Sequence, residues 1–189
     1  MPVGPASSAD LWLSAGVRVR PPSVPSVESV VARFVVVQEV RVPATATWTA
    51  LVDWPRHGRW APLTAVRTVT DRPDGVGAAF VARTGRGPVA FDDPMTVVGW
   101  EPPQGDSPGD RPGRCEVEKT GRVVRGRAWF SVTPLPDSRS RVVWAEDVTV
   151  SPHRVTRFAG PLLALAGRLG FAATLRAFAR DIEGVAPRR

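Results

Sequence analysis

The chain has 189 residues, of which 43% are hydrophobic and 23% are charged, with a formal net charge of +7. This composition fits a soluble, cytoplasmic globular domain whose core needs no disulfide, metal or other cofactor. One cysteine and two histidines exclude an intrachain disulfide framework and a cysteine-rich zinc site. No apolar run approaches the ~20 residues of a membrane-spanning helix, so we expect no integral membrane segment.

The positive charge is spread along the chain rather than gathered into one patch. All but one of the 25 basic residues are arginines, the exception being Lys119. The densest group, Arg122, Arg125 and Arg127, is not accompanied by a helix-turn-helix, a zinc finger or an aromatic RNA-binding motif. We therefore expect a solvated basic surface and no nucleic-acid partner.

Residues 1 to 31 are predicted to form a flexible, proline-rich tail before a domain of residues 32 to 186. The tail contains five prolines and no sustained hydrophobic periodicity. Its apolar island, Leu11 to Leu13, is too short for a core and lacks the preceding positive charge of a signal peptide.

The ordered part is predicted to begin with a strand and two short helical segments. Phe34 to Val42 is rich in β-branched residues and alternates so that Gln38 lies on its inward face. Ala44 to Val52 suits a short helix, because Pro43 before it is favourable at a helix N-terminus. His57 to Trp60 allows one more short helical turn.

The middle of the chain alternates between β-branched runs and turn residues, which predicts antiparallel strands rather than β-α-β units. A loop from Gln104 to Gly113, rich in proline and glycine, is predicted to be exposed and mobile. The predicted strands are Ala65 to Thr70, Gly77 to Thr84, Met95 to Trp100, Arg114 to Lys119, Val123 to Thr133 and Arg141 to Val150.

A helix is predicted from Pro161 to Glu183, which at 1.5 Å per residue spans about 35 Å. Gly167 and Gly170 in its middle predict a bend or a close packing contact. This helix is the element large enough to cover the apolar face of an antiparallel sheet. The predicted fold class is therefore α+β: a curved antiparallel sheet of about seven strands, wrapped around a long C-terminal helix, with a cavity between them.

Several short motifs occur in the order in which one superfamily carries them. They are Val40-Arg41-Val42-Pro43-Ala44, Thr47-Trp48-Thr49-Ala50-Leu51, Asp53-Trp54-Pro55, Arg59-Trp60-Ala61-Pro62, Gly75-Val76-Gly77, Trp100-Glu101-Pro102-Pro103, Gly126-Arg127-Ala128-Trp129-Phe130 and Ser140-Arg141-Val142-Val143-Trp144. By this order and spacing, residues 34 to 184 resemble the START-like helix-grip superfamily (SRPBCC), in its polyketide cyclase/dehydrase-like and lipid-transport branch.

The resemblance implies a hydrophobic cavity between sheet and C-terminal helix that takes a lipid-like or polycyclic small molecule. Some members of the superfamily are aromatase/cyclases, and many only bind or carry a ligand. The resemblance therefore assigns no catalytic residues to this chain. The residues expected to line the cavity and bind the ligand are Gln38, Trp60, Phe80, Met95, Trp100, Phe130, Trp144, Glu146, Leu165 and Leu169. The alternative for the aromatic residues among them is plain core packing.

Glu146 and His57 are the candidate acid–base residues. Alternation places Glu146 on the inward face between Trp144 and Val148, where burial would raise the pKa of its carboxyl group. The alternatives are that Glu146 lies near the strand end and pairs with an arginine, or that a bulge turns its side chain outward. His57 lies where the short helices would plug the cavity, and its alternative is an exposed loop histidine. Asp92 and Asp93 are consecutive, so a strand would place them on opposite faces.

Two functions of different classes remain open at this point. The first is binding or transport of a hydrophobic small molecule, which requires a cavity and no catalytic residues. The second is a polyketide cyclase or aromatase activity in the same cavity, with Glu146 or His57 moving protons. A third interpretation is a module that docks on a membrane or on another protein, because the surface is basic and outward-facing apolar residues on neighbouring strands could form a patch that would also support a homodimer. These residues are Val35, Val37, Trp129, Val143 and Ala145.

Overall fold

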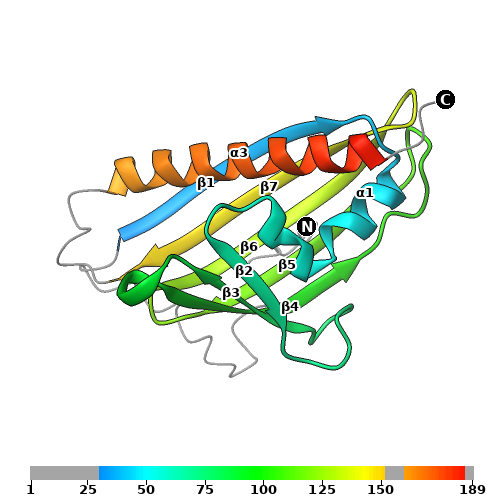
Figure 1. Cartoon of the computed structure of the whole chain (residues 1–189). Helices are drawn as coiled ribbons and strands as arrows, with labels where there is room; N and C mark the ends of the chain where they lie inside the picture. The colour runs from blue at the N-terminus through cyan, green and yellow to red at the C-terminus, as the bar shows by residue number, and fades with distance from the viewer. Residues whose placement is uncertain (1–29, 152–159, 186–189) are drawn as a thin grey trace, which may run out of the picture.

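A seven-stranded antiparallel sheet, with strand order β1-β7-β6-β5-β4-β3-β2, curves beneath one long helix in the computed structural model (Figure 1). The structure describes residues 30–151 and 160–185. The predicted α+β helix-grip fold is confirmed. The elements are β1 (Val30–Val40), α1 (Ala44–Leu51), the 3₁₀ helix η2 (Trp54–Arg59), β2 (Thr64–Thr68), β3 (Ala79–Thr84), the 3₁₀ turn η3 (Gly87–Val89), β4 (Phe91–Glu101), β5 (Gly113–Thr120), β6 (Val124–Leu135), β7 (Arg139–Val150) and α3 (Gly160–Val185).

Strand β1 begins earlier than its sequence pattern indicates. It pairs with β7 from Val30 opposite Val150, so two residues of the predicted tail belong to the sheet. The remainder of that tail, with Leu11 to Leu13, lies outside the described residues, as does residue 186 at the predicted domain end.

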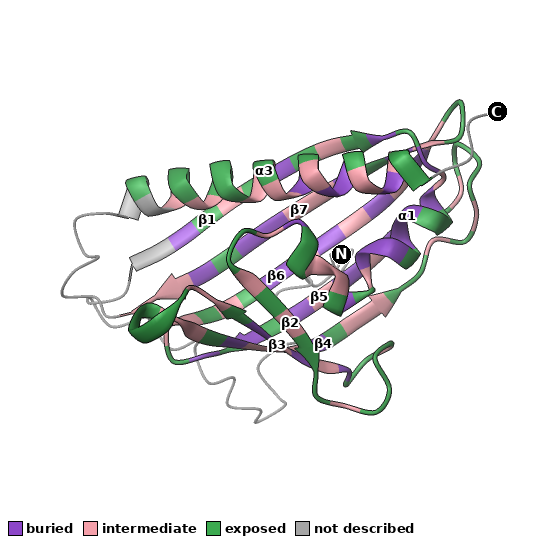
Figure 2. Cartoon of the chain, in the orientation of Figure 1, coloured by how far each residue is buried: buried purple, intermediate pink, exposed green. Residues whose placement is uncertain are grey.

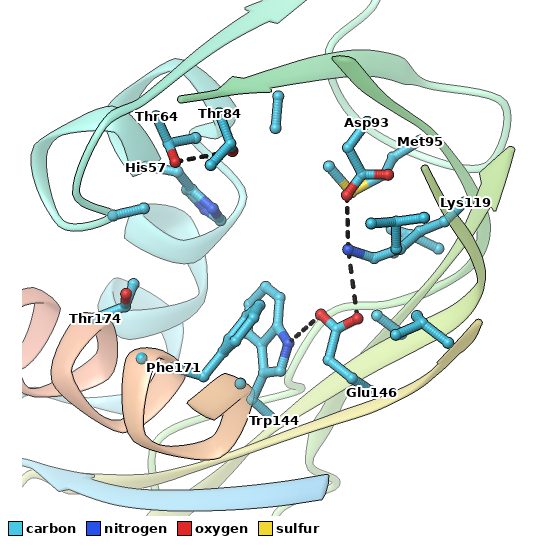
Figure 3. Close-up of a pocket in the computed structure, with 18 of the residues that line it drawn as sticks. His57, Thr64, Thr84, Asp93, Met95, Lys119, Trp144, Glu146, Phe171 and Thr174 are labelled. Atoms are coloured by element: carbon cyan, nitrogen blue, oxygen red, sulfur yellow. Dashed lines mark hydrogen bonds and ion pairs between the residues drawn. The ribbon is translucent and has the colours of Figure 1, made fainter. Parts of the chain in front are cut away.

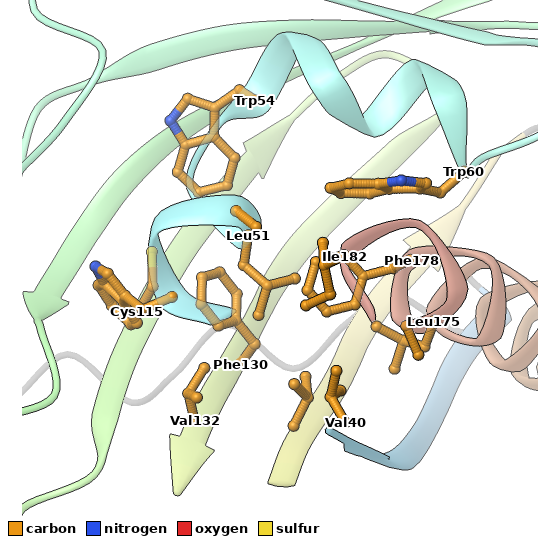
Figure 4. Close-up of a cluster of buried hydrophobic side chains, with 14 of the residues drawn as sticks. Val40, Leu51, Trp54, Trp60, Cys115, Phe130, Val132, Leu175, Phe178 and Ile182 are labelled. Atoms are coloured by element: carbon orange, nitrogen blue, oxygen red, sulfur yellow. The ribbon is translucent and has the colours of Figure 1, made fainter. Parts of the chain in front are cut away.

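The hydrophobic core sits at the end of the sheet that carries α1 and η2. From Ala128 onward in β6, buried residues alternate with half-buried ones (Figure 2), as the period of a strand requires. Phe130 of β6 packs there against Leu51 of α1 and Trp54 of η2, while Phe178 and Ile182 of α3 approach from the other side (Figure 4). These helices close the sheet at one end only.

Helix α3 differs between its two halves. In the C-terminal half, Leu175, Phe178 and Ile182 are buried in the core. In the N-terminal half, Gly167 lies close to β1, because an added Cβ would come within 2.8 Å of the Phe34 ring. Phe171 packs against the same ring, with centroids 5.2 Å apart. The close packing contact predicted for these glycines is therefore confirmed at Gly167.

A β-bulge interrupts the alternation of β4. The register with β5 shifts between Val97 and Gly99, so that Val98 is an extra residue. Because a bulge reverses the phase of the strand beyond it, Trp100 comes to lie opposite Cys115 on the inner face. The ring of Trp100 packs edge-on against Trp48 of α1, with centroids 5.2 Å apart.

The loop between β4 and β5 is fastened to the start of α1. Pro43, at the N-cap of this helix, has no side chain that could accept a hydrogen bond. Asp106 takes that role: its Oδ1 accepts from the Thr45 backbone N–H at 2.8 Å and its Oδ2 from the Thr45 hydroxyl at 2.8 Å. The predicted loop is exposed, but it is anchored at this point.

Candidate functional site

A cavity of about 440 Å³ lies between the inner face of the sheet and the N-terminal half of α3. Aromatic rings form much of its wall. Phe130 and Trp144 are stacked with centroids 5.3 Å apart, and Trp144 lies 5.6 Å from Phe171 of α3. The hollow predicted between sheet and helix is therefore present, and its lining is mainly apolar.

Most of the predicted site residues line this cavity. They are His57, Trp60, Phe80, Met95, Phe130, Trp144 and Glu146. They come from η2, its C-terminal flank and strands β3, β4, β6 and β7, so the fold brings together positions far apart in the sequence. Their contact with a ligand remains a prediction.

Two candidates on the sheet lie away from the cavity lining. Trp100 is on the inner face, but it lies beyond the bulge and packs beneath α1 instead. Gln38 shares the inward side of β1, yet it borders a separate polar groove with Arg176 and Arg180 of α3. Its side-chain amide donates to the Glu39 carbonyl oxygen at 2.7 Å.

Two candidates on α3 face solvent. Leu165 is 51% exposed and Leu169 is 59% exposed, and neither lines the cavity. The helix presents two apolar stripes, and the stripe of Phe171, Leu175 and Phe178 is the one that packs on the sheet. Leu165 and Leu169 belong to the other stripe, so placing them in the cavity was wrong.

A buried ionic cluster forms the polar part of the cavity wall (Figure 3). Lys119 Nζ of β5 lies 3.0 Å from Asp93 Oδ2 of β4 and 3.3 Å from Glu146 Oε2 of β7. The indole N–H of Trp144 donates to Glu146 Oε1 at 3.0 Å. All three charged residues are buried, and Asp93 Oδ1 has no hydrogen-bond partner within the described part of the chain.

The strand between β5 and β7 makes this cluster possible. Gly126 of β6 lies opposite Lys119, and Ala128 lies opposite Glu146. Neither residue has a bulky side chain, so the lysine can extend across β6 to reach the glutamate. Gly126 has a φ of 140°, and a Cβ there would come within 2.8 Å of Val148 Cα, so the position requires glycine.

Burial and the shared charges set the proton affinities of the cluster. Burial raises the pKa of Glu146, although the charge of Lys119 and the hydrogen bond from Trp144 oppose the shift. Burial alone would lower the pKa of Lys119, but the charges of Glu146 and Asp93 outweigh it and raise that pKa. Lys119 therefore remains an ammonium ion, while Glu146 holds a proton more readily than a free glutamate.

His57 lines another part of the cavity and is neutral near pH 7. Its Nε2 lies 2.7 Å from the Leu51 carbonyl oxygen, which can only accept, so Nε2 carries the proton and Nδ1 has a free lone pair. Burial lowers the pKa of the ring, against the opposing effects of that hydrogen bond and of Asp53. A neutral imidazole of this kind can act as a base.

Within residues 30–151 and 160–185, no group of three histidine, cysteine, aspartate or glutamate side chains is placed to hold a metal ion. None of the helices in these ranges combines the length and apolar character needed to cross a membrane.

The sequence matches no protein-family model and no curated protein. Solved structures with the same architecture are found nonetheless. A START superfamily protein from Mycobacterium smegmatis superposes with a TM-score of 0.61 at 14% identity, over 82% of this chain and 99% of that chain. The Zhui aromatase/cyclase from a Streptomyces species gives a TM-score of 0.59 at 16% identity, over 81% and 94% of the two chains.

This chain has the START-like helix-grip fold. Norcoclaurine synthase from Thalictrum flavum, solved with dopamine and hydroxybenzaldehyde, shares it with a TM-score of 0.54 at 15% identity, over 86% of this chain and 92% of that chain. The superfamily fold predicted from the motifs is thereby confirmed.

Sequence reasoning missed the charged partners of Glu146 in the cavity, Lys119 and Asp93, as well as aromatic lining residues such as Phe34 and Phe171. A signal for Lys119 was present, because it follows Cys115 and Val117 at intervals of two and all three share the inner face of β5. The same rule, used to separate Asp92 from Asp93, is confirmed: Asp92 is exposed and Asp93 is buried. The alternation rule alone did not show whether Asp92 or Asp93 faces the cavity.

Proposed function

We propose that this START-like domain binds or carries a hydrophobic small molecule, lipid-like or polycyclic, in the cavity beneath α3. The observation that supports this is a hollow of about 440 Å³ with a mainly aromatic and aliphatic lining. A ligand that buries about 300 Å² of apolar surface would gain roughly 7 kcal/mol before the costs of association. The rings of Trp144, Phe130 and Phe171 offer flat surfaces on which a polycyclic ligand can stack.

The test uses an aromatic probe and a variant that fills the cavity. Ala82 of β3 is buried and lines the cavity, whereas its neighbour Val81 points to the other face of the sheet. We expect 9-methylanthracene to bind the wild-type chain, seen as energy transfer from tryptophan to anthracene. Ala82→Phe should weaken that binding at least tenfold, and Val81→Phe should change it less than twofold.

Circular dichroism establishes that both variants are folded, and native mass spectrometry identifies any small molecule that copurifies. Failure of the probe to bind the folded wild-type chain would refute the proposal. Equal binding by the Ala82→Phe variant would place the probe elsewhere.

An enzymatic use of the cavity is the second candidate, a cyclase or aromatase acting on a poly-β-ketone chain. It is supported by the buried carboxylate of Glu146 and the free Nδ1 of His57 in one cavity. A base would take a proton from a methylene carbon, the resulting enolate carbon would add to a carbonyl of the same chain, and the alkoxide would regain the proton. Chromatography of a synthetic poly-β-ketone thioester tests this, since Glu146→Gln and His57→Gln should slow cyclisation while 9-methylanthracene still binds.

A homodimer through the outer face of the sheet is a further part of the proposal. Val35 and Val37 of β1 are 51% and 56% exposed, and they neighbour Ala145 and Val143 of β7. Trp129 of β6 lies beside Ala145 on the same face, but Ala145 is only 7% exposed and the Arg114 guanidinium lies over the Trp129 ring, so the exposed part of the patch is centred on β1. In sedimentation equilibrium we expect the wild-type chain to dimerise and Val37→Asp to be monomeric. A cytoplasmic location remains a prediction from composition.

A further inference from the structure

We infer that the ligand's polar end is a hydrogen-bond donor without negative charge, a hydroxyl or an amine, and that it meets the Lys119–Asp93–Glu146 cluster. This inference rests on the proposed binding function. It narrows the ligand class, because it excludes fatty acids and other ligands whose only polar group is a carboxylate or a phosphate.

The charge of the cluster carries the inference. Among the described residues, Lys119 is the cation within ion-pair distance of both Asp93 and Glu146, so one ammonium group is shared by two carboxyl groups. An additional anion would therefore face two acidic groups and an ammonium that is already engaged. In a cavity lined mainly by apolar side chains, water cannot screen that repulsion well.

The hydrogen bonds of the cluster also favour a ligand that donates a hydrogen bond. Asp93 accepts from Lys119 through Oδ2, while its Oδ1 is buried without a partner within the described residues. A buried acceptor of this kind is costly to leave unsatisfied. Asp93 is part of the cavity lining and its side chain is 11% exposed, so we expect a ligand donor to reach Oδ1 after a small rotation of the carboxyl group. A ligand hydroxyl or amine supplies that donor, and a carboxylate cannot.

The ammonium group also favours a hydroxyl. Lys119 has three N–H donors, and its contacts with Asp93 and Glu146 use two of them. A hydroxyl can donate to one carboxyl oxygen and accept from the third N–H of Lys119. In Figure 3 the cluster lies on one side of the open space and His57 and Thr174 lie on the other, so the apolar body of the ligand extends from the cluster along Trp144 and Phe171.

The test compares four anthracenes that share one ring system: 9-methylanthracene, 9-anthracenemethanol, 9-(aminomethyl)anthracene and anthracene-9-carboxylate. Dissociation constants are measured at pH 7.5 by energy transfer from tryptophan. We expect the alcohol and the amine to bind the wild-type chain at least tenfold more tightly than the carboxylate.

Neutralising both acidic residues should invert this preference. In the Asp93→Asn/Glu146→Gln variant Lys119 has lost both counter-charges, and a bound carboxylate would replace them and favour the ammonium form. The carboxylate should therefore bind at least tenfold more tightly than in wild type and the amine more weakly. Asp92→Asn, on the outer face of the same strand, is the matched control and should leave the order unchanged. If the double variant does not fold, Asp93→Asn alone should shift the ratio of carboxylate to alcohol binding in the same direction.

The outcomes separate this inference from the proposed function. If 9-methylanthracene binds but the carboxylate binds the wild-type chain as tightly as the alcohol, the inference is overturned and the binding function stands. A ratio that does not respond to the acidic substitutions also overturns it. If 9-methylanthracene and the three other probes all fail to bind, the proposed function fails and the inference falls with it.

Discussion

Asp92 and Asp93 are consecutive residues of β4 that form ion pairs of equal length in opposite surroundings. Asp92 Oδ1 lies 3.0 Å from Arg83 Nη1 on the outer face, where both side chains are at least half exposed. Asp93 Oδ2 lies 3.0 Å from Lys119 Nζ inside the fold, where the lysine side chain is 7% exposed. One strand therefore contains a matched pair of interactions that differ chiefly in burial.

Removing the cation from each pair should have very different consequences. Lys119→Met leaves Asp93 and Glu146 buried without a counter-charge, and we expect it to lower the free energy of unfolding by about 3–5 kcal/mol. Arg83→Met removes an exposed pair and should cost about 0–1 kcal/mol. Urea denaturation followed by tryptophan fluorescence measures both. Similar losses for the two variants would mean that the lysine cluster is not buried in solution.

His57 should make the fold sensitive to mild acid. Burial lowers the pKa of His57 in the folded chain, so the unfolded chain takes up a proton first as the pH falls. Stability contributed by the neutral ring is therefore present above the unfolded pKa of about 6.5 and is lost as the pH falls through the lower folded pKa.

Urea denaturation at pH 7.5 and at pH 5.5 measures this loss. We expect His57→Gln to lose less stability than the wild-type chain between these two values, because glutamine does not titrate. Between pH 8.5 and pH 7.5 the two chains should change in parallel. A parallel change down to pH 5.5 as well would show that the ring titrates normally.

The two mid-helix glycines of α3 should respond differently to alanine. At Gly170 an added Cβ meets nothing within 4 Å, so Gly170→Ala should stabilise the fold by about 0.5–1 kcal/mol through helix propensity. At Gly167 the Cβ would come within 2.8 Å of the Phe34 ring, so Gly167→Ala should give no gain or a loss. Thermal denaturation of both variants tests this, and equal gains would contradict the close contact between α3 and β1.

The sheet could be predicted because two local features of the sequence indicate strands: the alternation of apolar residues and the turn residues between them. Alternation along β6 and β7 placed Phe130, Trp144 and Glu146 on the inner face correctly, and turn residues marked where the strands end. These signals fail where one residue changes the phase. The bulge at Val98 places Trp100 beneath α1, and no side chain in the sequence marks it.

The cavity was harder to predict than the sheet because it depends on pairs of elements. Both stripes of α3 are apolar, and which stripe faces the sheet depends on tertiary packing, with Gly167 against Phe34 and Leu175 and Phe178 in the core. The cluster of Lys119 with Asp93 and Glu146 unites three strands across the small residue Gly126. Such an arrangement follows from strand order, which the sequence pattern alone leaves open.

Because Asp106 supplies the cap that Pro43 cannot, helix α1 depends on a residue far downstream. Thr45 and Asp106 are separated by 61 positions. An eight-residue helix is too short to persist alone in water. During synthesis on the ribosome, α1 therefore emerges without its cap and can acquire it only after the polypeptide has been extended past Asp106.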